Sequence, residues 1–296
     1  MRKGDFPNSQ YHPDFSSADG RVDLTVILVS REKMLFCVNE SVLRASSSVF
    51  DTILSLPQPT EDTPSDLFID NLDESATTLE GLLRMITGRE LPPLDTIEAI
   101  EPLVLAAHKW KMSGPLSILK MILVRDTTFA QNNPIRVYSL GCRLKWGALV
   151  TSGAKYSCNY HIYYHQVIES VLETMDPADL LRLVRFHRRR RDCMRAYFDG
   201  NALGKMVCIY SPQYQSLRAK FLEFMDNNSP GKPLGESALR NLVAQSRLET
   251  HDTLACRLRN DGDEHPGRLS GTATIDFVVP KLLVQWKALP QDISTP

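Results

Sequence analysis

Near the start of the chain, the pattern of hydrophobic and polar positions is first typical of β-strands and then of helices. Residues 23–29 are apolar on both faces and rich in β-branched side chains, which predicts a strand covered on both sides. The polar stretch 30–33 predicts a turn, so 34–38 should return as the hairpin partner. Asn39 then stands where a helix N-cap is needed, and we predict a short helix through Ala45.

The pattern continues with helices on either side of one more strand. Ser46 to Ser48 should cap a second helix, 57–64 is a polar loop broken by prolines, and 67–69 should form the third strand. A further helix should stop at Gly88. The inward positions of these two helices are hydrophobic: Val49, Phe50, Ile53 and Leu54 in the first, and Leu79, Leu82, Leu83 and Ile86 in the second.

After a linker at Pro92-Pro93, the chain becomes mainly helical. We predict a helix that opens at Pro102, a helix with a stripe of leucines after Gly114, and helices capped at Asn133-Pro134 and Asp176-Pro177. The leucine stripe and the inward face of the helix after Asn133 consist of Leu116, Leu119, Leu123, Val137, Leu140 and Leu144. The remaining elements that we predict are helices at 214–225 and 237–248, a loop at 261–271 and a strand at 272–279.

One run of residues resembles a known family. A strand ending in Phe36-Cys37-Val38 leads into Asn39-x-x-x-Leu43 and then Ser47-x-x-Phe50, which is similar to the strand, His-x-x-x-Leu and Ser-x-x-Phe pattern of the BTB/POZ domain. Ser55-Leu-Pro-Gln-Pro59 resembles the large fungal, mushroom-type subgroup. The resemblance implies an α+β fold in which Leu43 and Phe50 close a small core. It also implies protein binding rather than catalysis.

The resemblance divides the chain into three parts. Residues 12–125 would be the BTB/POZ domain, a small sheet surrounded by helices. Residues 126–250 would be a mainly α-helical extension of the kind that follows many BTB domains. Residues 251–296 would be an irregular segment that contains the predicted strand. The length of 296 residues suits about two domains.

The resemblance leaves the partner open. BTB transcription factors pair an aspartate with a basic residue in a dimer groove, but the matching positions here are Asp23 and Glu40, whose charges repel. A homodimer of that kind is therefore not expected, although self-association stays open. The alternatives are a substrate adaptor of a cullin-type ubiquitin ligase and a nuclear transcriptional regulator. Residues 57–61 lack the apolar-x-Glu segment of such adaptors.

Composition and charge agree with a globular protein inside the cell. Hydrophobic residues make up 43% and charged residues 23% of the chain, with a formal net charge of -1. This balance gives no general attraction to nucleic acid or to a membrane surface. The N-terminus lacks a signal-peptide pattern, so we expect an intracellular protein of the cytoplasm or nucleus.

Candidate chemistry is sparse. The spacing Cys158-x-x-His161-x-x-x-His165 offers three metal ligands near one helix face, but the second Cys/His pair of a zinc site is missing, so packing is the preferred interpretation. The arginine run at 188–191 suits a solvated helix face, with a nuclear-import signal or a patch for an acidic partner or a phosphate backbone as alternatives. Phosphate-binding, nucleophile-elbow and zincin motifs are absent. We therefore predict no catalytic residue, metal or cofactor, and no enzyme activity.

Overall fold

The computed structural model describes residues 10–16, 25–56, 67–70, 72–159, 171 and 174–199, together with the isolated positions 219, 222, 223, 241 and 284. The elements predicted at 214–225, 237–248 and 272–279 fall outside these stretches. The chain forms two compact units, Met1–Thr127 and Thr128–Pro296. The fold is mixed α and β, with a small three-stranded sheet and a mostly helical remainder.

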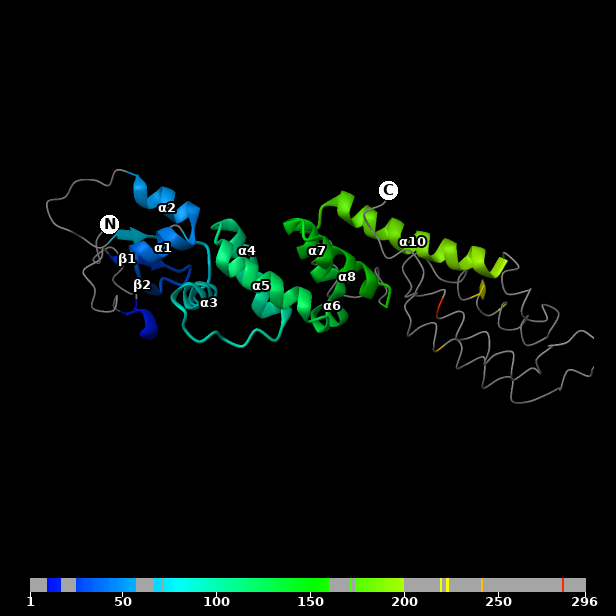
Figure 1. The fold of residues 1–296 in the computed structure, drawn as a ribbon, viewed down its shortest axis with the longest axis horizontal. Helices are drawn as coiled ribbons and strands as arrows, with labels where there is room; N and C mark the ends of the chain where they lie inside the picture. Colours follow the sequence, from blue (N-terminus) through cyan, green and yellow to red (C-terminus); the bar gives the residue numbers. More distant parts are fainter. Residues whose placement is uncertain are drawn as a thin grey trace, which may run out of the picture. The chain divides into compact units, whose positions relative to one another are not determined.

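The sheet lies in the first unit and is built from the predicted hairpin (Figure 1). Strand β1 (Thr25–Val29) runs antiparallel to β2 (Leu35–Asn39), with Val29 opposite Leu35. Strand β3 (Leu67–Ile69) joins the other side of β1 in parallel, which gives the order β2-β1-β3. The last four residues of β1 are buried, as predicted for a strand covered on both faces.

Two short helices follow the hairpin, each started by a side-chain cap. Asn39 Oδ1 accepts the Ser41 N–H at 2.8 Å, which begins α1 (Glu40–Ser46). Ser47 Oγ accepts the Phe50 N–H at 3.1 Å and begins α2 (Ser48–Ser55). Both caps were predicted, and so was the burial of Leu43 and Phe50, which are 0% and 2% exposed.

The longer helices of the first unit are α3 (Ala76–Thr87), α4 (Ile97–Lys109) and α5 (Ser113–Arg125). The prediction that Pro102 opens α4 is wrong, because the helix begins five residues earlier. Thr96 caps it by accepting the Ala99 N–H, and Pro102 lies inside the helix with its ring exposed. A proline at an exposed position removes one backbone hydrogen bond without displacing a packed neighbour.

The second unit contains α6 (Thr128–Asn132), α7 (Pro134–Leu144), α8 (Gly147–Ser157) and α10 (Pro177–Asp199). Helices α7 and α8 pack closely because each has a glycine at the contact. A Cβ on Gly153 would lie 2.6 Å from the backbone nitrogen of Tyr138, and one on Gly141 would lie 2.7 Å from that of Val150. Neither α6 nor α8 was predicted from the sequence.

The two caps predicted in this unit have different outcomes. Asp176 Oδ1 accepts the Ala178 N–H at 2.7 Å, which confirms the predicted start of α10. Asn133 precedes α7 as predicted, but its side chain makes no capping hydrogen bond, so Pro134 at the first position of the helix marks the start. Of the helices described, none has both the length and the apolar composition needed to cross a membrane.

Candidate interaction surfaces

Glu40 lies in an ion pair on α1. Its Oε1 accepts the Arg44 Nε–H at 2.6 Å, one helical turn away. The same guanidinium donates to the Ser55 hydroxyl at 2.7 Å and to the Leu54 carbonyl, which fastens α1 to the end of α2. The hydrogen bond and charge of Glu40 raise the pKa of Arg44. Glu40 therefore has a structural partner in its own helix, while Asp23 lies outside the described residues.

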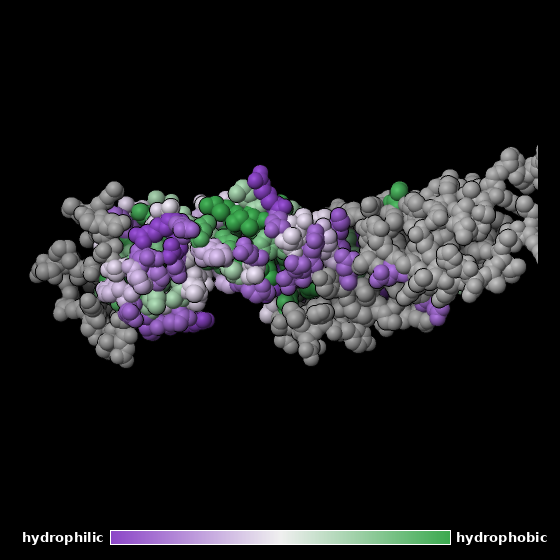
Figure 2. Space-filling model, turned by 90° about the horizontal axis from the view of Figure 1, so that it is seen from below, coloured by the Kyte–Doolittle hydropathy of each residue, from purple (hydrophilic) through white to green (hydrophobic). Residues whose placement is uncertain are grey.

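Helix α5 exposes an apolar stripe. Leu119 and Leu123 are buried, as predicted, whereas Leu116 is only half-buried. The opposite face carries Ile118, Met121 and Val124, which are 36%, 51% and 41% exposed. Figure 2 shows hydrophobic surface over the region of α4 and α5, next to hydrophilic surface on neighbouring elements. Three large apolar side chains at helical spacing form a surface suited to a protein partner.

The second unit buries a polar cluster between α8 and α10. His187 Nε2 lies 2.8 Å from Ser157 Oγ and 4.0 Å from Cys158 Sγ. Ser157 is 0% and His187 6% exposed. His187 lies on the buried side of α10. The sequence did not predict the hydrogen bond to Ser157, because the two residues are far apart in the chain.

The hydrogen bonds of this cluster indicate which group donates a proton and which accepts it. Ser157 Oγ lies 2.7 Å from the Ala154 carbonyl, which can only accept, so the hydroxyl donates its one proton there. His187 must then donate from Nε2 to Ser157, and the imidazole is the Nε2–H tautomer. A base that activates a serine would have to accept the hydroxyl proton. The pair therefore lacks the arrangement of a catalytic nucleophile and is sealed from solvent.

Burial also governs the ionisation of this cluster. It lowers the pKa of His187 to about 3, and the positive charges of Arg190 and Arg191 act in the same direction. Burial raises the pKa of the Cys158 thiol to about 11. At neutral pH the imidazole and the thiol are both uncharged, and the thiol donates to the Ala154 carbonyl at 3.6 Å. These are the properties of packed groups rather than of a reactive cysteine.

The candidate metal ligands are brought together only in part. Cys158 approaches His187, but His161 and His165 lie outside the described residues. Within the part that the structure describes, no group of three or more His, Cys, Asp or Glu side chains is placed to hold a metal ion. The prediction of a metal-free protein therefore remains a prediction.

The arginine run is divided between core and solvent. Arg188 and Arg189 are exposed, Arg191 is half-buried and Arg190 is only 3% exposed, with its guanidinium carbon 5.5 Å from the centre of the Phe186 ring. Burial lowers the pKa of Arg190. The prediction of a solvated helix face is therefore confirmed for Arg188 and Arg189 and is wrong for Arg190.

Comparison with known proteins gives no assignment. No family model matches the chain, and no curated protein matches it significantly. The interpretation of the chain must therefore come from its own residues.

Proposed function

We propose that the chain is a non-catalytic protein-protein interaction protein of the BTB/POZ type. The observation that carries this proposal is the apolar stripe of Ile118, Met121 and Val124 on α5. Exposing such side chains to water is unfavourable, and a protein partner that covers them would remove this cost. The side chains project from one helix of a well-packed unit, so they are held in place before a partner binds.

The arrangement of the first unit supports the BTB/POZ assignment. A β hairpin leads into two short helices, which is the order of the motif that carries the resemblance, and a third strand and longer helices follow. Leu43 and Phe50 are both buried in the core. Phe50 also lies near the end of α4, since Ser47, which caps the helix that carries Phe50, donates from its hydroxyl to the Trp110 carbonyl at 2.5 Å. The residues of the sequence motif thus hold the unit together.

The buried cluster of the second unit supports a non-catalytic role. Its serine, cysteine and histidine are of the kinds that serve as nucleophile and base, yet they are sealed from solvent and the imidazole donates to the hydroxyl. An adaptor of a cullin-type ubiquitin ligase and a nuclear regulator are both forms of the proposed interaction protein. The identity of the partner that covers α5 distinguishes them.

Affinity capture of the full chain from cells, followed by quantitative mass spectrometry, tests the proposal. We expect the wild-type chain to recover a protein in roughly stoichiometric amount, and the double variant Ile118→Glu/Met121→Glu to lose it. Leu56→Glu is the control, because it places a negative charge on another exposed apolar residue of the first unit, 58% exposed. A cullin among the captured proteins would identify an adaptor. Equal recovery with the double variant and the wild type would exclude α5 as the binding surface.

A further inference from the structure

Three exposed arginines on α10 have no hydrogen-bond or ion-pair partner among the residues that the structure describes. The helix carries seven arginines and three aspartates. Arg182 forms an ion pair with Asp179 at 2.6 Å, but no ion pair or hydrogen bond joins Arg185, Arg188 or Arg189 to any described residue, and all three are exposed. We call these three residues the arginine face.

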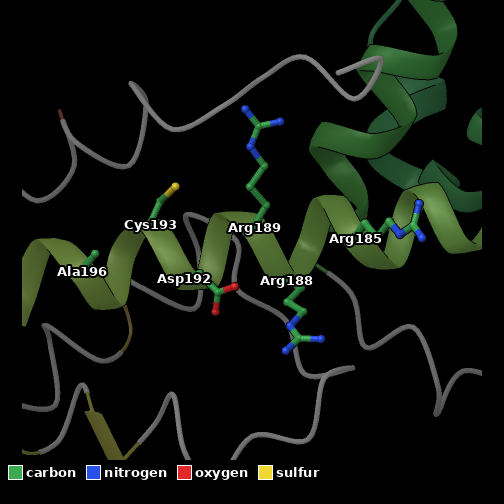
Figure 3. Close-up of a pocket in the computed structure, with 6 residues that line it drawn as sticks. All are labelled: Arg185, Arg188, Arg189, Asp192, Cys193 and Ala196. Atoms are coloured by element: carbon green, nitrogen blue, oxygen red, sulfur yellow. The ribbon is translucent and has the colours of Figure 1, made fainter. Parts of the chain in front are cut away.

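The arginine face borders an open hollow of about 420 Å³. Its lining among the described residues is Arg185, Arg188, Arg189, Asp192, Cys193 and Ala196. Figure 3 shows Arg188 and Asp192 extending from one side of α10, and Arg189 and Cys193 from the other. Arg185 and Arg189 are four residues apart, so their backbones are separated by roughly 6 Å along the axis. The three guanidinium groups therefore lie along about one turn of α10, with Arg188 on one side of the helix and Arg189 on the other.

We propose that the arginine face binds an acidic segment of a protein partner. Arginine donates two parallel hydrogen bonds to a carboxylate, and three unpaired guanidinium groups provide charge complementarity for several carboxylates. A partner helix with acidic residues four apart repeats at the same interval of roughly 6 Å. This inference concerns the second unit and does not depend on the apolar stripe of α5.

The neighbours of the arginine face favour a protein segment over a phosphate backbone. Asp192 places a negative charge about one helical turn beyond Arg188, at the end of the arginine face, which opposes the dense, continuous charge of a nucleic acid but can be avoided by a peptide with spaced carboxylates. Ala196 lines the hollow and Leu181 is 48% exposed on the same helix. These apolar groups can contact the aliphatic side chains of a peptide.

Fluorescence anisotropy with the full chain tests this inference. The probes are a labelled helical peptide with glutamates four residues apart, the same peptide with glutamines, and a labelled DNA duplex. The variants are Arg185→Gln/Arg188→Gln/Arg189→Gln and, as a control for the loss of positive charge outside α10, Arg125→Gln/Arg143→Gln, which removes two exposed arginines elsewhere. Circular dichroism checks that each variant is folded.

We expect the glutamate peptide to bind more tightly than the glutamine peptide, and the affinity to fall as salt is raised. The triple variant should weaken binding about tenfold or more, the control double variant should leave it within about twofold, and Asp192→Asn should strengthen it. Three results would overturn the inference: equal binding of the two peptides, equal loss in both arginine variants, or tighter binding of the DNA duplex than of the glutamate peptide.

Discussion

The rings of Phe50 and Trp110 stack nearly parallel, with their centroids 4.8 Å apart and an angle of 9° between their planes. Phe50 belongs to α2, and Trp110 follows the last residue of α4. Ser47 strengthens the same junction, since it caps α2 and donates to the Trp110 carbonyl. One aromatic contact and one hydroxyl thus join two segments that are 63 residues apart in the chain.

Phe50→Ala should destabilise the first unit by about 3–5 kcal/mol, because it removes a buried ring and leaves Trp110 without its stacking partner. Chemical denaturation followed by circular dichroism measures the loss. Leu56→Ala, at an exposed position close to the end of α2, should change stability by no more than about 0.5 kcal/mol. Equal effects of the two substitutions would mean that the Phe50 ring is not part of the core.

Gly153→Ala should destabilise the second unit by about 1–3 kcal/mol, since the added methyl group would clash with the backbone of Tyr138 at the contact of α7 and α8. Gly147→Ala is the matched control on the same helix, because a Cβ there meets nothing within 4 Å. The melting temperatures of the two variants make the comparison. A fully stable Gly153→Ala protein would show that α7 and α8 do not approach as closely as described.

His187 should make the second unit sensitive to mild acid. Its folded pKa of about 3 lies below the ordinary value of 6.5, so between these values the unfolded chain binds a proton that the folded protein does not. The associated stability is complete above pH 6.5 and is lost as the pH falls towards 3, at about 1.4 kcal/mol per pH unit.

The free energy of unfolding, measured at several pH values between 6.5 and 5, tests this linkage. Most carboxylates stay ionised in that range, so they contribute little to the slope. His187→Gln removes the titrating ring and should flatten the pH dependence relative to the wild type. An unchanged slope in this variant would contradict the burial of a neutral imidazole beside Ser157 and Arg190.

Treatment with a strong chelator should leave the helicity and the melting temperature unchanged. Both Cys158 and His187 already have hydrogen-bond partners in the chain, and the thiol is protonated at neutral pH. A cysteine that binds zinc would have to be a thiolate. Stoichiometric zinc by elemental analysis of the purified protein, with loss of helicity on its removal, would reverse this prediction.

Local signals in the sequence were sufficient for much of the first unit. The two-sided apolar run, the polar turn and the caps Asn39 and Ser47 each depend on neighbouring residues, and they led to the correct hairpin and helices. Pro102 misled the prediction of α4, because the effect of a proline depends on whether its ring faces solvent or a packed neighbour.

Features that depend on tertiary contacts could not be predicted in the same way. Helix α8 was missed because its contact with α7 uses glycine, so the hydrophobic stripe that marks a helix is weak. The burial of Arg190 over Phe186 depends on packing that a charge run does not reveal. The exposed stripe of α5 is likewise visible only after the other face of the helix is seen to be covered.

We propose that the apolar stripe of α5 binds another protein, and sedimentation velocity of the purified chain, alone and mixed with its captured partner, tests this proposal. We expect a discrete complex for the wild type and for Leu56→Glu, and free components for Ile118→Glu/Met121→Glu. A complex that forms equally well with the double variant, or a wild-type chain that stays a monomer under all conditions, would contradict it.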